Sequence, residues 1–141
     1  MNRLQQPGFV DDLGFTRRGF ALPENLDISR CSFWKSGDWC SNVILGVFEG
    51  VETAAFDFEH RDDFGYTQTV VAMKSNARIF TLPTMLQASE ITAERAGDWI
   101  LMFRPKKEIA LKELPALLAD CRILLRYFED EERDGARSQI G

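Results

Sequence analysis

Residues 42–74 read NVILGVFEGVETAAFDFEHRDDFGYTQTVVAMK, and this stretch decides the fold. Gly50 separates two β-rich runs, and in the second run aromatic and acidic residues alternate: Phe56, Asp57, Phe58 and Glu59. Such alternation is typical of a strand with one buried face and one wet face. A third run, rich in β-branched residues, follows the loop at 60–65. The stretch therefore predicts a three-stranded antiparallel meander.

Further short strands are predicted on both sides of the meander, at 31–35, 78–82, 90–94 and 99–104. Pro83 ends the run 78–82 because proline has no N–H to donate to a strand ladder. The run 99–104 is almost entirely apolar, so we expect it to lie centrally. Together the runs predict an antiparallel sheet of five to seven strands.

The chain from Leu111 onward changes to the helical period. Its large apolar residues recur every three or four positions: Leu111, Leu114, Leu117, Leu118, Cys121, Leu124, Leu125 and Phe128. An apolar stripe of this kind must cover a hydrophobic surface, here one face of the sheet. Pro115 falls in the first turn, where its missing N–H costs little. We predict one amphipathic helix over 111–129 and a charged tail at 130–141 that frays.

These elements predict a single α+β domain over residues 1–141, a length at which one hydrophobic core forms. The domain comprises an irregular arm at 1–30 packed on the core, an antiparallel sheet at 31–104 and the C-terminal helix. Several folds share this outline. The order of elements makes the pleckstrin-homology-like fold, a bent sheet packed by a terminal helix, the first candidate.

Composition and charge favour a soluble cytoplasmic protein. The net charge of −5 and the pI near 4.9 disfavour binding to DNA phosphates or anionic lipid, so no nucleic-acid partner is predicted. No run approaches the roughly 18 apolar residues of a membrane span, and the N-terminus lacks the apolar stretch of a signal peptide. The three cysteines form no CxxC pair, and we expect them to be thiols: Cys31, Cys40 and Cys121.

The patterns of common catalytic sites are missing from the sequence. No GxSxG elbow, GxxxxGK[ST] loop or GxGxxG motif occurs, and one histidine permits only one histidine-assisted nucleophile. That histidine, His60, lies among acidic residues that suggest a divalent-ion site: Asp57, Glu59, Asp62 and Asp63. On a strand His60 points to the face opposite Asp57 and Glu59, so a solvated hairpin tip is the preferred interpretation. We predict no enzymatic activity, no cofactor and no metal.

Aromatic residues supply the best candidate for a binding site. Trp34 and Trp39 bracket a polar turn at 35–38, where an exposed tryptophan would anchor a partner protein. The alternative interpretation is that both tryptophans fold back over the sheet. Basic doublets at 17–18 and 106–107 are a weaker candidate, for an anion-binding patch.

Three short motifs mark the meander: Gly-x-aromatic-x-Gly at 46–50, aromatic-Asp-aromatic at 56–58 and Gln-Thr-Val-Val at 68–71. In these motifs, and in the closing strand and helix, residues 42–129 resemble a group of uncharacterised bacterial proteins. The resemblance implies a shared fold and a bacterial source. The motifs are structural, so the resemblance implies no activity.

We therefore predict a non-enzymatic protein-interaction or scaffolding module. The competing hypothesis is a binder of a lipid or another small apolar ligand in a pocket between sheet and helix. An exposed patch around Trp34 and Trp39 favours a protein partner. A cavity lined by four other aromatic residues favours a small ligand: Phe56, Phe58, Trp99 and Phe103.

Overall fold

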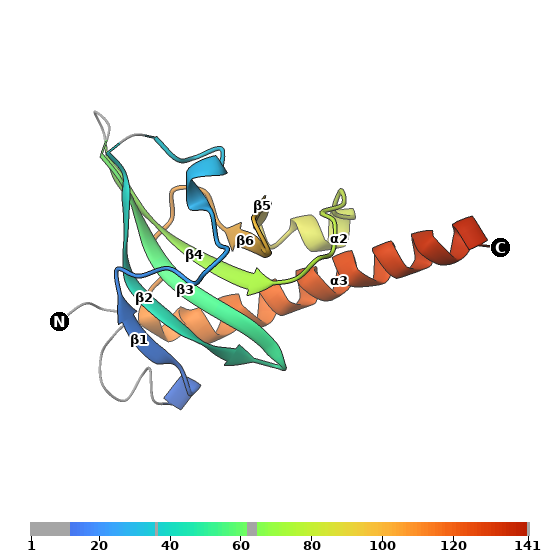
Figure 1. Cartoon of the computed structure of the whole chain (residues 1–141), viewed down its shortest axis with the longest axis horizontal. Coiled ribbons are helices and arrows are strands. Elements are labelled where there is room, and N and C mark those ends of the chain that lie inside the picture. Colours follow the sequence, from blue (N-terminus) through green and yellow to red (C-terminus); the bar gives the residue numbers. More distant parts are fainter. Residues whose placement is uncertain (1–11, 36, 62–64, 141) are drawn as a thin grey trace.

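The structure is a computed structural model, and it describes residues 12–35, 37–61 and 65–140, with only the backbone for 136–140. One open antiparallel sheet of six strands is crossed by a long C-terminal helix (Figure 1). The predicted α+β class is confirmed. The likeness to the pleckstrin-homology-like fold stays a prediction.

The six strands form a sheet in the order β1-β2-β3-β4-β6-β5, and every neighbouring pair is antiparallel. Their bounds are β1 Thr16–Gly19, β2 Trp39–Phe48, β3 Val51–His60, β4 Tyr66–Lys74, β5 Thr92–Ala96 and β6 Trp99–Phe103. Strands β2, β3 and β4 are the predicted meander. Gly50, with a φ of 81°, occupies the turn between β2 and β3, where a residue without Cβ is favoured. β6 lies between β4 and β5 and is buried throughout.

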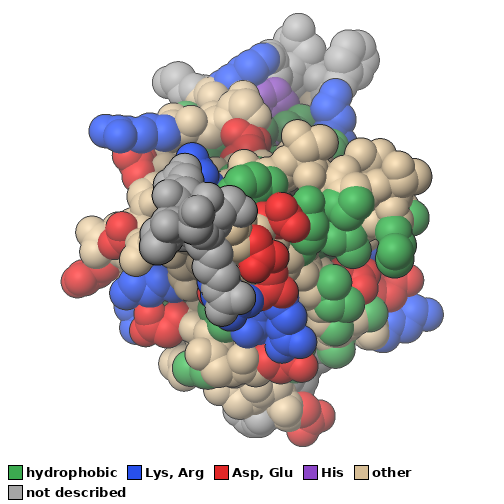
Figure 2. Space-filling view, turned by 90° about the vertical axis from the view of Figure 1, so that its right-hand side faces the viewer, with side chains coloured by type: hydrophobic (Ala, Val, Ile, Leu, Met, Phe, Trp, Pro, Cys, Tyr) green, Lys and Arg blue, Asp and Glu red, His purple; other side chains and the backbone are tan. Residues whose placement is uncertain are grey.

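The helical elements are η2 Ile28–Arg30, α2 Thr84–Gln87, η3 Leu111–Glu113 and α3 Leu114–Ile140. η3 and α3 together cover the predicted helix, and α3 then continues through the tail that we predicted to fray. In Figure 1 the C-terminal part of α3 projects past the sheet. Figure 2 looks at the side toward which α3 projects and shows acidic and basic side chains interspersed with smaller hydrophobic groups.

α3 covers one face of the sheet with the predicted apolar stripe. Seven of its residues are at most 1% exposed: Leu114, Leu117, Leu118, Cys121, Leu124, Leu125 and Phe128. They share one cluster with side chains from β2, β3, β4 and β6, among them Ile44, Val71 and Ile100. Burial of this stripe supplies most of the driving force for docking the helix.

The N-terminal arm covers the opposite face. Leu26, Ile28 and Cys31 share a second buried cluster with sheet residues such as Phe56 and Leu101. The central strands are therefore buried on both faces, which explains their almost continuous apolar runs.

The prediction that β3 has a wet face is wrong. Asp57, which was expected on that face, is only 2% exposed. Its carboxylate accepts hydrogen bonds from Asn42 Nδ2 at 2.7 Å and from Thr69 Oγ1 at 3.1 Å. A carboxylate with such partners tolerates burial, so polar residues in a strand pattern do not always mark solvent.

Two predicted strands are absent from the described residues, and one strand was not predicted. The run 31–35 forms a turn closed by a bond from Trp34 N to Cys31 O. In the run 78–82, backbone groups bond to side chains of α2 and α3 instead of to a strand. β1 escaped prediction because its sequence, TRRG, has no apolar alternation.

Candidate functional site

An open apolar groove of about 560 Å³ lies where the N-terminal arm meets the start of β2. Its lining comes from two segments of the chain: Phe20, Leu22, Ile28, Trp34, Asp38, Trp39 and Cys40. The structure therefore brings both predicted tryptophans into one site. Phe20, Leu22 and Ile28 were not predicted as site residues, because only folding places the arm beside β2. The one signal for them in the sequence is the number of large apolar residues in an arm that forms no regular element.

The two tryptophans differ in exposure. Trp39 is 40% exposed, and Phe20 is 72% exposed. Trp34 is half-buried and packs on the second core, with its ring centroid 6.0 Å from that of Phe58. Trp34 thus folds back over the sheet as part of the groove wall, whereas Trp39 presents its ring to solvent.

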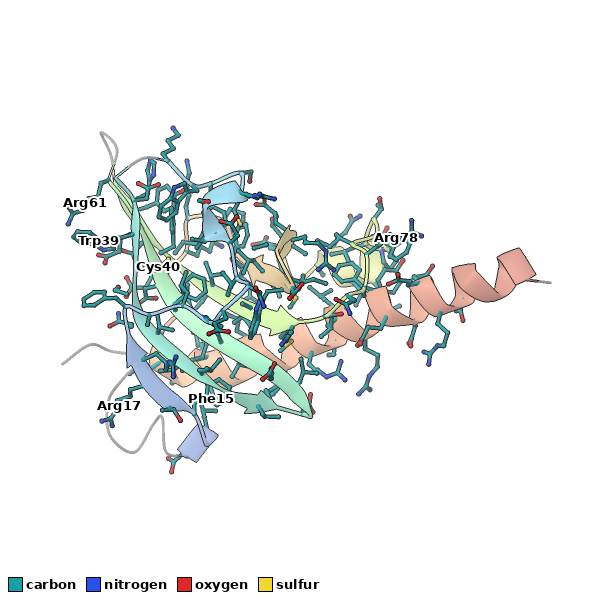
Figure 3. All side chains as sticks on the ribbon, viewed as in Figure 1. Phe15, Arg17, Trp39, Cys40, Arg61 and Arg78 are labelled. Carbon is teal, nitrogen blue, oxygen red and sulfur yellow. The ribbon has the colours of Figure 1, made fainter. Side chains whose placement is uncertain are left out.

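Trp39 is held in place on two sides. Its indole N–H donates to the Glu59 carboxylate, which also accepts from Ser41 Oγ at 3.1 Å. The Arg61 guanidinium lies over the indole, with Cζ 3.2 Å from the ring centroid. Figure 3 shows the two side chains next to each other on the β2 side of the sheet. A cation over an aromatic face adds attraction, so contacts within the chain fix the position of the Trp39 ring in the groove wall.

Buried Asp38 joins the turn at 35–38 to the end of β3. Its carboxylate accepts from Lys35 N at 2.9 Å and from Arg61 N at 3.1 Å, and lies 3.0 Å from His60 Nδ1. Burial by itself raises the pKa of the Asp38 carboxyl. The hydrogen bonds from His60, Arg61 and Lys35 outweigh burial, and the pKa lies below the ordinary value for aspartate.

His60 is therefore packed against Asp38, with the Tyr66 ring centroid 4.9 Å away. Of the described acidic residues near it in the sequence, Asp57 accepts hydrogen bonds from Asn42 and Thr69, and Glu59 accepts from Trp39 and Ser41. Among the residues that the structure describes, no group of three or more acidic, histidine or cysteine side chains is placed to hold a metal ion. Asp62 and Asp63, which belonged to the predicted cluster, lie outside the described residues.

Replacing Asp38 by asparagine is expected to lower the free energy of unfolding by about 1–3 kcal/mol near neutral pH, because a buried donor loses its acceptor. The carboxyl pKa is lower in the folded protein than in the unfolded chain. The contribution of the ionised carboxyl to the free energy of unfolding is therefore complete above its pKa in the unfolded chain, about 3.9. This contribution is lost as the pH falls through the pKa of the carboxyl in the folded protein. Urea unfolding at a series of pH values should show the wild type and the variant converging on acidification.

Glu52→Gln is the matched control, since Glu52 is exposed and forms an ion pair at the surface with Lys74, at 3.3 Å. We expect this change to alter stability by less than about 0.5 kcal/mol. A gap between wild type and Asp38→Asn that stays constant down to acid pH would contradict the assignment.

The three cysteines are free and buried, as expected of thiols. Burial raises the pKa of the Cys31 thiol and of the Cys40 thiol to about 12. Burial also raises the pKa of Cys121, within the stripe of α3. All three thiols are therefore neutral at physiological pH, and Cys40 contributes an uncharged wall to the groove.

The two basic doublets do not come together. Arg17 and Arg18 are exposed on β1, at one edge of the sheet. Lys106 lies over the Tyr66 ring, and Lys107 pairs with Glu90 at 3.4 Å and bonds through its carbonyl to β4. Because β2 and β3 separate β1 from β4, the strand order does not support the weaker candidate, a combined anion-binding patch.

Within the described residues, no helix is both long and apolar enough to cross a membrane. Comparison of the chain with models of protein families, with curated proteins and with solved structures finds no match.

Proposed function

We propose that this protein is a non-enzymatic interaction module that binds a partner protein in the groove between the arm and β2. The observation that carries the proposal is the exposed Trp39 ring, held rigid by Glu59 and Arg61 at the rim of an open apolar groove. Tryptophan is enriched among the residues that contribute most to protein interfaces. A rigid anchor also loses little conformational freedom on binding.

The packing of the other aromatic residues supports a protein partner over a ligand held between sheet and helix. Four residues were expected to line such a ligand cavity, and all are at most 4% exposed and packed in the core: Phe56, Phe58, Trp99 and Phe103. The sheet face beneath α3 is likewise filled by the helix stripe. An open groove at the surface suits a side chain that belongs to a larger partner.

The chemistry of the groove supports binding over catalysis. Among the lining residues that the structure describes, Cys40 is the one thiol, and it is buried with a pKa of about 12. Asp38 is the one carboxylate among them, and it is held by two backbone N–H groups and His60. Both groups serve the packing of the site, and the other described lining residues are apolar.

Replacing Trp39 by alanine is expected to weaken binding of the partner by about 30-fold, equivalent to about 2 kcal/mol, as for other interface hot spots. Proteins that bind the wild-type chain would be identified by mass spectrometry. Each would then be purified and titrated calorimetrically against wild type and variant. Met85→Ala is the matched control, because Met85 is 84% exposed and lies outside the groove.

Partner affinities that are equal for wild type and Trp39→Ala would overturn the proposal. A stoichiometric fatty acid or lysolipid that remains on the purified protein in native mass spectrometry would favour the ligand hypothesis instead. Unfolding curves of both variants should match the wild type to within about 1 kcal/mol, since both side chains lie at the surface.

A further inference from the structure

Within the described part of the chain, the outer edge of β2 is paired over only part of its length. β1 pairs with β2 from Thr16↔Leu45 to Gly19↔Val43, whereas β3 pairs with β2 from Trp39 onward. Among the described strands, Trp39–Ser41 therefore has a neighbour on one side only. We call this segment the β2 gap. It begins where Gly19, with a φ of 64°, turns the chain away from the sheet.

The apolar groove runs along this gap. Trp39 and Cys40 are successive strand residues, so their side chains point to opposite faces of the sheet. Both nevertheless line the groove. A groove with both residues in its wall must follow the strand edge, and Phe20 and Leu22, which follow β1 in the chain, form its other side.

Cationic side chains lie along the same edge. Arg17 and Arg18 are exposed on β1, and Arg61 stacks on Trp39. Figure 3 shows Arg17, Trp39 and Arg61 along the β1–β2 side of the sheet. None of the three arginines forms a salt bridge with another described residue. Two carboxylates near the gap, those of Asp38 and Glu59, are already engaged in hydrogen bonds.

We propose that the groove receives an extended peptide segment of the partner, which adds a strand to the β2 gap and carries one large apolar residue flanked by acidic residues. Strand addition satisfies the backbone groups of an open edge, and alternate side chains of the added strand reach a pocket beside it. The arginines supply the charge complementarity to the acidic flanks, on a chain whose net charge is −5. This inference rests on the proposed function and names the chemistry of the partner.

The test is selection of a phage-displayed library of random linear peptides on the full-length protein. Enriched peptides are expected to share an aromatic or large aliphatic residue with Asp or Glu on either side. Fluorescence anisotropy with the synthetic, labelled peptide should show at least tenfold weaker binding to Trp39→Ala. Arg17→Glu and Arg61→Glu should each weaken binding severalfold, whereas Arg126→Glu, on the exposed surface of α3, should not.

Backbone N-methylation of the peptide distinguishes a strand from other bound forms. In an added strand every second amide faces β2, so methylation at alternate positions should abolish binding and methylation between them should leave it unchanged. Loss of binding without this alternation would contradict the claim that the peptide binds as a strand. Apolar anchors spaced by three and four residues would contradict it as well. Neither result would contradict the claim that a peptide binds in the groove. Failure to enrich any peptide whose binding depends on Trp39 would also overturn the peptide proposal. The proposed function would then be tested only by the calorimetric titration of purified partner proteins.

A second copy of this chain is the other occupant that an open strand edge admits. Size-exclusion chromatography coupled to light scattering measures the molar mass in solution and so distinguishes a monomer from a dimer. A dimer of the wild type that Trp39→Ala converts to a monomer would overturn the peptide proposal. A monomer for both proteins is the expected result.

Discussion

Replacing Phe128 by alanine is expected to lower the free energy of unfolding by about 3–5 kcal/mol, the largest effect of any substitution considered. Phe128 is fully buried at the end of the α3 stripe, in the cluster that joins the helix to the sheet. Removing its ring takes away transfer free energy and leaves a cavity that the neighbours fill only in part. Equilibrium unfolding in urea, followed by far-UV circular dichroism, measures the difference.

Ile123→Ala is the matched control on the same helix. Its side chain is 55% exposed and points away from the core, so we expect a loss of no more than about 1 kcal/mol. Phe128→Leu, which retains most of the volume, should lie between the two. Equal losses for Phe128→Ala and Ile123→Ala would show that α3 does not dock through this stripe.

The second large effect is expected for Gly97→Ala, at about 2–4 kcal/mol. Gly97 lies in the β5–β6 turn with a φ of 64°, and a Cβ there would overlap the carbonyl oxygen of Asn25 in the arm. The same contact is closed by a bond from Asp98 N to Asn25 O at 3.0 Å and one from Trp99 Nε1 to Glu24 O at 3.1 Å. The overlap must separate the hairpin tip from the arm and break these bonds.

Gly50→Ala measures the backbone-strain part of this effect, so the difference between the two variants gives the part that is due to overlap with the arm. Gly50 also has a positive φ, of 81°, but a Cβ at that position meets no other atom. We expect a loss of about 1 kcal/mol from backbone strain alone. Urea unfolding of both variants gives the comparison, and equal losses would contradict the contact between the hairpin tip and the arm. Because the arm carries Leu22 and Ile28, Gly97→Ala should also weaken binding in the groove.

The elements that were predicted correctly are those whose residue pattern reports the environment directly. The meander follows from β-branched runs separated by Gly50, and α3 follows from leucines spaced by three and four. The alternation in β3 gave a wrong prediction for Asp57. Asn42 and Thr69, on the neighbouring strands, take the place of water as hydrogen-bond donors to its carboxylate. Pairing of that kind is a property of the folded sheet and leaves no local trace in the sequence.

The same reason limits prediction of the site. Trp34 and Trp39 stand out because tryptophans beside a turn are conspicuous in any sequence. Phe20 joins them only because Gly19 redirects the arm after β1, and β1 itself has no recognisable strand pattern. The run 78–82 has the composition of a strand, yet its backbone bonds to Glu132, Tyr127 and Gln87. Long-range partners therefore decide both the misassigned strand and the unpredicted half of the groove.

Coverage of the sheet on both faces separates the residues of the proposed binding site from those that stabilise the fold. With α3 on one side and the arm on the other, both faces of the central strands are buried. The binding that we propose therefore takes place at the edge of the sheet. Substitutions at that perimeter change surface side chains such as Trp39 and Arg61 and leave both cores untouched. If the proposed binding site is correct, its preference for a partner can change through substitutions at the sheet edge that leave the fold intact.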